Sequence, residues 1–142
     1  MVAIPKQKRK KGERSKLVAK LIWTAKQIVY IRDESTCQRC GKLVNGLNRQ
    51  ASHVRPVSAG SPLRWDPLNM KVLCFFDHLH WWHKNPLEAA AWFQGKFPQR
   101  YAHIESHKEN IKLSIPELQD DLVRLESELK TLQSVDGNDT MV

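Results

Sequence analysis

The sequence predicts a mainly helical α+β fold, in which a small core with two short strands lies between an N-terminal and a C-terminal helix. Three observations predict it. Apolar residues recur at helical spacing near both ends of the chain, two strand-like segments lie between them, and cysteines flank these segments. At 142 residues the chain has room for one domain with extensions. We expect a disordered basic tail at 1–14, a core domain at 15–113, a C-terminal amphipathic helix at 114–134 and a disordered tail at 135–142.

The basic residues are concentrated at the start of the chain. The net charge is +8, and the first 32 residues hold ten Lys or Arg and one Glu. This distribution favours binding to a polyanion, for which the tail offers Lys8, Arg9, Lys10, Lys11 and Arg14. Such a dense run of like charge should stay disordered until it meets phosphate. The alternative is a tail that only improves solubility.

The number of cysteines and the hydropathy of the chain indicate the cellular compartment in which we expect the protein. Three cysteines, an odd number, do not suggest a secreted disulfide scaffold. The sequence has no signal peptide, and Lys20 and Lys26 interrupt the apolar stretch near its start that could be considered for a membrane span. We therefore expect a cytoplasmic protein that does not enter a membrane.

The first helix is expected from Ser15 to about Arg32. Ser15 is a suitable N-cap, and lysines are available for a solvated basic face. The helical spacing is seen in Val18, Leu21, Ile22, Ala25, Ile28 and Val29.

A zinc knuckle is expected directly after this helix. Cys37 and Cys40 have the two-residue spacing that allows two thiolates to bind one tetrahedral ion from a tight turn, and Cys74 and Asp77 repeat that spacing. A carboxylate oxygen can replace the fourth thiolate. His78 is an alternative fourth ligand, and three metal-free cysteines are the remaining interpretation.

Between the two knuckle halves, the order is strand, loop, strand and helix. Residues 51–54, which include His53, and residues 69–74 have strand character, and the segment that joins them is rich in Pro and Gly. A helix-like run with three histidines follows. At about 100° per residue, His80 and His83 share a helix face whereas His78 and His83 do not, so we expect His78 just before the helix.

This order resembles the HNH (ββα-metal) nucleases, and more closely the phage NinG (Rap) recombination-nuclease family. The resemblance covers roughly residues 30–103. It is carried by Cys-Gln-Arg-Cys-Gly-Lys (37–42), Ala-Ser-His-Val (51–54), Leu-Arg-Trp-Asp-Pro-Leu-Asn (63–69) and Cys-x-x-Asp-His-x-x-Trp-Trp-His-Lys-Asn-Pro (74–86). It implies an HNH ββα-metal core with a structural zinc and a catalytic divalent cation, Mg²⁺ or Mn²⁺.

The resemblance also implies residue roles. His53 matches the general base that takes a proton from water, and Asn69 the residue that pins the loop between the strands. His78 matches a ligand of the catalytic cation, with His83 as a further ligand. Ser52 departs from the pattern, because many HNH enzymes have a metal-binding carboxylate before the base. Asp77, where the family usually has a fourth cysteine, is the second departure.

The expected function is therefore metal-dependent hydrolysis of DNA phosphodiester bonds. Phosphodiester hydrolysis needs an activated water and a cation on the phosphate oxygens, and neutral histidine can supply the base at physiological pH. Arg55 and Arg64 are the DNA-binding candidates of the core domain. By resemblance, the substrate is a branched recombination intermediate in the bacterial host cell of a phage. The alternatives are a nickase of ordinary duplex DNA and a non-catalytic zinc-knuckle DNA-binding module.

Helices are expected after the histidines as well. Asn85-Pro86 should begin one that ends at Gly95 or Pro98, and a short one is expected near 100–113. Ser114 and Glu117 form a capping box ahead of a leucine seam. The acidic residues that flank this seam argue against a parallel coiled coil. A homodimer remains open, and we expect the basic helix of residues 15–32 to cover the seam, within the chain or from a second copy. The seam is formed by Ile115, Leu118, Leu122, Leu125, Leu129 and Leu132.

Overall fold

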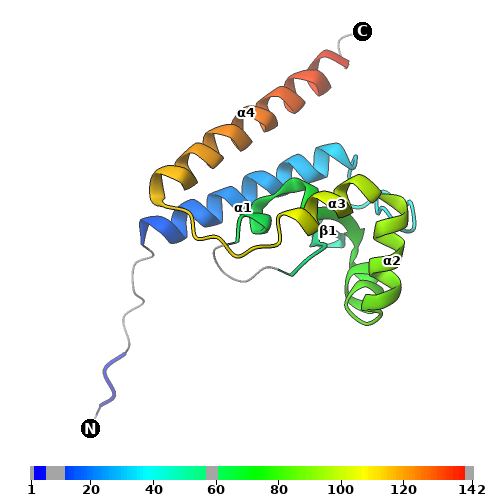
Figure 1. The fold of residues 1–142 in the computed structure, drawn as a ribbon, viewed down its shortest axis with the longest axis horizontal. Coiled ribbons are helices and arrows are strands. Elements are labelled where there is room, and N and C mark those ends of the chain that lie inside the picture. Colours follow the sequence, from blue (N-terminus) through cyan, green and yellow to red (C-terminus); the bar gives the residue numbers. More distant parts are fainter. Residues whose placement is uncertain (1, 6–11, 57–60, 140–142) are drawn as a thin grey trace.

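The computed structural model describes residues 2–5, 12–56 and 61–139. Figure 1 shows the long helix α1 through the middle of the molecule, with α4 on one side and a two-stranded hairpin, α2 and α3 on the other. The expected mainly helical α+β architecture is confirmed. In chain order the elements are α1 (Glu13–Arg32), η1 (Gly46–Asn48), β1 (Arg49–His53), η2 (Pro62–Trp65), η3 (Pro67–Asn69), β2 (Met70–Cys74), η4 (Asp77–Trp82), α2 (Pro86–Lys96), α3 (Pro98–Ser106) and α4 (Ile115–Asp139).

Helix α1 begins two residues earlier than expected, because Gly12 rather than Ser15 occupies the N-cap position. Its predicted apolar face is buried at Leu21, Ala25, Ile28 and Val29. None of the helices in the described ranges is both long and apolar enough to cross a membrane.

The end of α1 is fastened to the hairpin by a charged pair. Arg32 donates to the backbone carbonyls of Pro67 (2.6 Å) and Met70 (2.7 Å), and it forms an ion pair of 2.9 Å with Asp33. The other carboxylate oxygen of Asp33 accepts from the backbone N–H of Val72 (2.9 Å). Since these groups would otherwise be buried without partners, the pair fixes how β2 lies against the helix.

Strands β1 and β2 form an antiparallel hairpin in which Ser52 pairs with Lys71 and His53 with Met70. Every residue of β2 is buried, because α1 covers this part of the sheet. The strands start at Arg49 and Met70, so β1 begins two residues earlier than expected and β2 one residue later.

Helices α2 and α3 follow the predicted order with different bounds. α2 ends at Lys96, and Gly95 lies within it rather than at its end. Pro98 starts α3 instead of ending its predecessor, because proline is suited to the first turn of a helix. α3 ends at Ser106, well before the expected residue 113.

Helix α4 begins with the predicted capping box. The Glu117 carboxylate accepts from the Ser114 backbone N–H (3.1 Å), and the Ser114 hydroxyl accepts from the Glu117 N–H (3.3 Å). The helix continues to Asp139, past the expected end at 134, so residues 135–139 are helical rather than a disordered tail.

Helix α4 lies alongside α1 of the same chain (Figure 1). Its leucine seam is therefore covered by the basic helix within the chain, which is the first of the two arrangements that the sequence left open. Lys20 of α1 forms an ion pair of 3.5 Å with Glu126 of α4 at the edge of this contact. Among the seam residues, Leu118, Leu122, Leu125 and Leu129 are buried.

Candidate functional site

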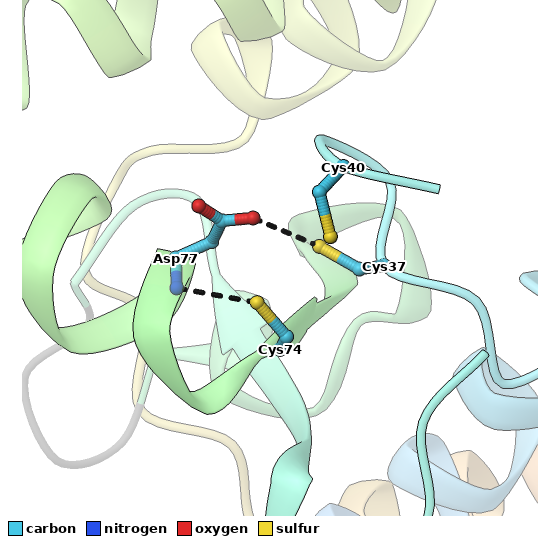
Figure 2. A group of neighbouring side chains, drawn as sticks. All are labelled: Cys37, Cys40, Cys74 and Asp77. Carbon is cyan, nitrogen blue, oxygen red and sulfur yellow. Dashed lines mark hydrogen bonds between the residues drawn. The ribbon is translucent and has the colours of Figure 1, made fainter. Parts of the chain in front are cut away.

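The predicted knuckle residues converge on one point. Cys37 and Cys40 come from the turn after α1, Cys74 from the end of β2 and Asp77 from the start of η4 (Figure 2). One ligand atom from each of the four residues lies within 4.8 Å of every other. The turn closes through a hydrogen bond of 2.9 Å from the Gly41 N–H to the Cys37 carbonyl, and the φ of +77° at Gly41 is a conformation that favours glycine.

The donor set fits a structural zinc ion. Ligand atoms bound at about 2.3 Å around a tetrahedral ion lie about 3.8 Å apart, so small shifts would complete the site. One Asp77 oxygen lies 3.3 Å from the Cys37 sulfur, while the other accepts from Arg39 (2.7 Å). The Arg39 guanidinium also stacks on Trp81, with its central carbon 4.0 Å from the ring centre. Arg39 therefore holds Asp77 so that one carboxylate oxygen faces the thiols, as residues that orient a metal ligand do.

The pKa shifts of the cluster residues agree with a site for a dication. Burial raises the pKa of the Cys37 thiol, and burial together with a hydrogen bond to Asp77 raises the pKa of Cys74 to about 12. Burial opposes ionisation of Asp77, but hydrogen bonds from Arg39, Cys37 and Cys74 outweigh it and lower its pKa. Without an ion the Cys37 and Cys74 thiols would stay protonated, and a dication would offset the desolvation of their thiolates. His78 is not part of this group, so the alternative in which it completes the zinc site is not supported.

A groove of about 740 Å³ brings together the three histidines for which the resemblance implies a role. His53, His78 and His83 line it together with Lys26, Arg64 and Trp82. Histidines from β1, η4 and the residue after η4 thus share one cavity with two basic side chains.

His53 is held through one of its ring nitrogens. Its Nε2 lies 2.9 Å from the carbonyl oxygen of Arg64. Because a carbonyl only accepts, Nε2 carries the hydrogen and Nδ1 is left with a free lone pair. Burial lowers the pKa of His53, and the positive charges of Lys26, Lys71 and Arg64 add to this, so the ring is neutral at physiological pH.

A π-helix brings His78 and His83 together. η4 is a π-helix, and the His83 N–H donates to the His78 carbonyl at 3.3 Å, a bond five residues apart. Residues five apart therefore align, and the two Nε2 atoms lie 3.3 Å from each other. The expectations that His78 precedes the helix and that His80 and His83 share a face were wrong, because they assumed α-helical spacing. His80 instead packs against Phe76, with ring centres 5.1 Å apart and the ring planes tilted by 38°.

The histidine pair has the spacing of two ligands on one cation. Nitrogens bound at about 2.1 Å to one ion lie roughly 3.0–3.4 Å apart for right-angle to tetrahedral geometry. Burial lowers the pKa of His78 to about 4, and the charges of His83 and Lys71 contribute. Neutral imidazole is the form that binds metal. The Nδ1 of His78 is buried and has no hydrogen-bond partner among the described residues, so packing rather than a hydrogen-bond acceptor behind the ring holds it in place.

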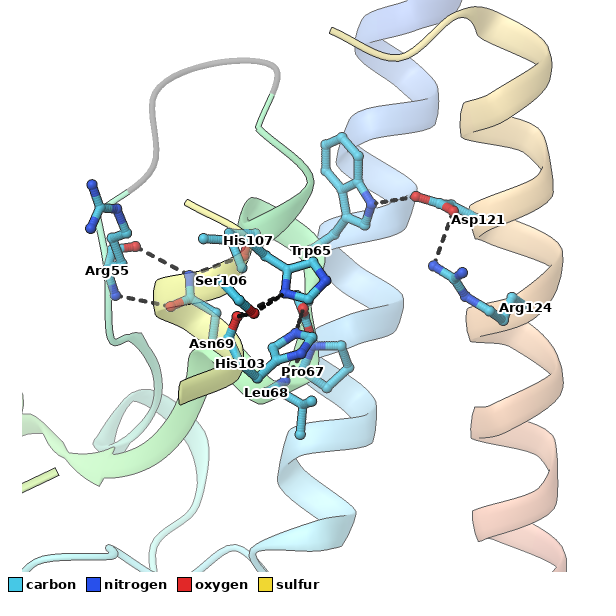
Figure 3. Close-up of polar contacts among 12 residues, drawn as sticks. Arg55, Trp65, Pro67, Leu68, Asn69, His103, Ser106, His107, Asp121 and Arg124 are labelled. Atoms are coloured by element: carbon cyan, nitrogen blue, oxygen red, sulfur yellow. Dashed lines mark hydrogen bonds and ion pairs between the residues drawn. The ribbon is translucent and has the colours of Figure 1, made fainter. Parts of the chain in front are cut away.

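Asn69 ties the two ends of the inter-strand loop together (Figure 3). Its side-chain oxygen accepts from the Arg55 N–H (2.9 Å), and its amide nitrogen donates to the carbonyls of Arg55 (3.2 Å) and Leu63 (3.0 Å). Leu63 directly precedes Arg64, whose carbonyl orients His53. These contacts are those of a residue that fixes the loop.

Ser52 points away from the groove. Its hydroxyl accepts from Lys71 Nζ (2.8 Å), which also donates to the His53 carbonyl (3.2 Å) and lies 3.1 Å from the centre of the Trp82 ring. Lys71 is fully buried, and this burial holds its pKa well below the usual range. The position before His53 therefore supports the hairpin and offers no cation ligand.

The predicted DNA-binding residues are dispersed. Arg64 lines the histidine groove and Arg14 a second groove along α1, while Arg55 lies 3.9 Å from Glu105. Lys26 and Trp82 belong to the site but were not predicted, since nothing local distinguishes them from other helix lysines and core tryptophans. Lys8, Arg9, Lys10 and Lys11 lie outside the described residues, as does half of the predicted disordered tail. Arg14, the last residue of that predicted tail, is instead part of α1.

Comparison with protein-family models, curated proteins and solved structures finds no match to this chain. The resemblance to HNH nucleases therefore rests on the order and spacing of the residues of this chain. The structure supports one part of it, a cluster beside the hairpin that could hold a metal ion.

Proposed function

We propose that this protein is a metal-dependent endonuclease of the HNH type that hydrolyses DNA phosphodiester bonds in the histidine groove. One observation carries the proposal: a neutral histidine with a free Nδ1 shares the groove with two histidine nitrogens spaced for one cation. Lys26 and Arg64 give the same groove a positive rim that suits phosphate.

Each group then has a step in the hydrolysis. His53 Nδ1 takes a proton from water, and the resulting hydroxide attacks phosphorus as the bond to the leaving oxygen breaks. A cation held by His78 and His83 would stabilise the charge on the phosphate and on the leaving alkoxide. Asn69 keeps the loop, and through it the Arg64 carbonyl, in place behind His53. The zinc cluster is structural in this scheme.

The cation should be a transition metal in preference to Mg²⁺. Imidazole ligands suit softer divalent ions, whereas Mg²⁺ prefers carboxylate and carbonyl oxygens, and Ser52 leaves the groove without the usual carboxylate. We expect Mn²⁺ to support cleavage at lower concentration than Mg²⁺.

The test is cleavage of supercoiled plasmid by the purified, zinc-containing protein with added Mn²⁺ or Mg²⁺. His53→Ala should lower the rate by a factor of about 10² or more, because a general base contributes on the order of 10²–10⁴. DNA binding should persist, since the base acts on water. His80→Ala is the matched control, because His80 is an exposed histidine on the same π-helix that does not line the groove.

Two outcomes would contradict the proposal. Cleavage by His53→Ala at the rate of the unmodified protein would remove His53 from the mechanism. DNA binding without cleavage under any divalent cation would favour the non-catalytic module. If cleavage is found, a panel of junction, flap, duplex and single-stranded substrates separates a branched-DNA nuclease from a nickase of ordinary duplex.

A further inference from the structure

A second groove, of about 910 Å³, runs along one face of α1. Its floor is formed by residues that recur three and four apart on the helix, and its other wall comes from Arg64 of η2 and Lys112 of the segment between α3 and α4. The floor residues used below are Ser15, Ala19, Ile22, Trp23 and Lys26. From Ser15 to Lys26 the helix rises about 16 Å, enough for several nucleotides of an extended strand.

Trp23 is the unusual residue of this groove. Its side chain is 59% exposed, whereas Trp65, Trp81 and Trp82 are buried and Trp92 is half-buried. Among the described residues it stacks on no other ring and has no cation over its face, unlike Trp81, Trp82 and Trp92. The small side chains of Ser15 and Ala19 lie on the same helix face, so a flat group has room to approach the indole.

The groove is positively charged throughout. Its basic side chains include Lys26, Arg64 and Lys112, and no Asp or Glu lines it. No described residue forms an ion pair with any of these three, although Lys20 on another face of α1 is paired with Glu126. Unpaired cations beside an exposed indole are the combination that binds nucleic acid by phosphate contact and base stacking.

We propose that this groove binds an unpaired strand of DNA, with a base stacked on Trp23 and phosphates on Lys26, Arg64 and Lys112. An unpaired strand is chosen over a duplex because stacking on Trp23 needs the face of a base, which a duplex conceals. Lys26 and Arg64 also line the histidine groove, so the strand leads directly to it. That last step rests on the proposed nuclease function; strand binding itself does not.

The test is titration of the full-length protein with a fluorescein-labelled oligothymidylate, followed by anisotropy without added Mn²⁺ or Mg²⁺. Trp23→Ala should weaken binding about 5- to 150-fold, the range that stacking of one base contributes, and should leave the salt dependence unchanged. Lys26→Ala should make the slope of log affinity against log salt shallower by about 0.7, because it removes one phosphate contact to a single strand. Trp23→Phe should restore most of the affinity.

The matched control is Val123→Ala, which removes a 67% exposed apolar side chain from α4, outside the groove. Equal binding of single strand and duplex, or a Trp23→Ala variant that binds like Val123→Ala, would overturn the inference. A folded protein that binds oligothymidylate through Trp23 but never cleaves DNA would leave the inference standing and contradict the nuclease proposal. Cleavage of DNA by the unmodified protein, together with unchanged oligothymidylate binding by Trp23→Ala, would support the nuclease proposal and contradict this inference.

Discussion

Leu125→Ala tests whether packing of α4 on α1 stabilises the protein within one chain. Leu125 lies in the middle of the leucine seam and is 3% exposed. Truncation of a buried leucine to alanine costs 2–5 kcal/mol, from lost transfer free energy and the cavity left behind. We expect a loss of about 3 kcal/mol in the free energy of unfolding. For a chain of this size this corresponds to a decrease of roughly 10 °C in Tm.

Thermal unfolding followed by circular dichroism measures this loss, with Val123→Ala as the control. Val123 is two residues away on the same helix and is 67% exposed, so its truncation should change stability by less than about 0.5 kcal/mol. Because the contact is intramolecular, the decrease in Tm should not depend on protein concentration. Equal Tm values for the two variants, or a loss that appears only in dilute samples, would refute the packing of α4 on α1 within one chain.

Three further predictions concern the metal, the base and the tail. Metal analysis should find one tightly bound zinc per chain, and Cys74→Ser should lose both the zinc and cooperative unfolding, since structural zinc binding is coupled to folding; a folded, active, zinc-free protein would contradict the cluster. The acid limb of the pH–rate profile for cleavage should lie below pH 6.5, because burial lowers the pKa of His53 and the neutral ring is the active form. The rate should therefore hold as the pH falls to 6.5 and decline below it; a limb above 6.5 would exclude a buried His53 as the base. Deletion of residues 1–11 should weaken binding to all DNA sequences alike and flatten the salt dependence, and an unchanged slope would mean that this segment does not contact phosphate.

The sequence was sufficient to predict features with local causes. The Cys-x-x-Cys spacing, the Ser114–Glu117 capping box and the leucine seam each depend on residues a few positions apart. Element bounds were less accurate, since Gly95 is tolerated within a helix as well as at its end, and Pro98 suits the first turn of a helix as well as a position just after one. The π-helix could not be predicted, because the periodicity of the segment is compatible with an ordinary α-helix and only the packed state selects bonds five residues apart.

The basic grooves show a different limit of sequence-based reasoning. Lys26, Arg64 and Lys112 lie far apart in the chain, and none has a neighbour that marks it. Arg64 was predicted to bind DNA, but Lys26 and Lys112 were not. The other predicted positions were mostly in the dense cluster at residues 8–11, because charge density is visible in a sequence whereas convergence in space is not.

The metal cluster and the histidine pair are linked through the start of η4. Asp77 is the first residue of the π-helix and also a member of the cluster, while His78, the next residue, faces the groove. Since His78 Nδ1 has no hydrogen-bond partner among the described residues, the orientation of this ring depends on the backbone that carries it. That backbone is held by the Asp77 N–H, which donates to the Cys74 sulfur (3.3 Å), and by the Asp77 side chain, which accepts from Arg39. An ion bound by the cluster would therefore set the register of the π-helix, and with it the 3.3 Å spacing that the proposed binding of a cation by His78 and His83 requires.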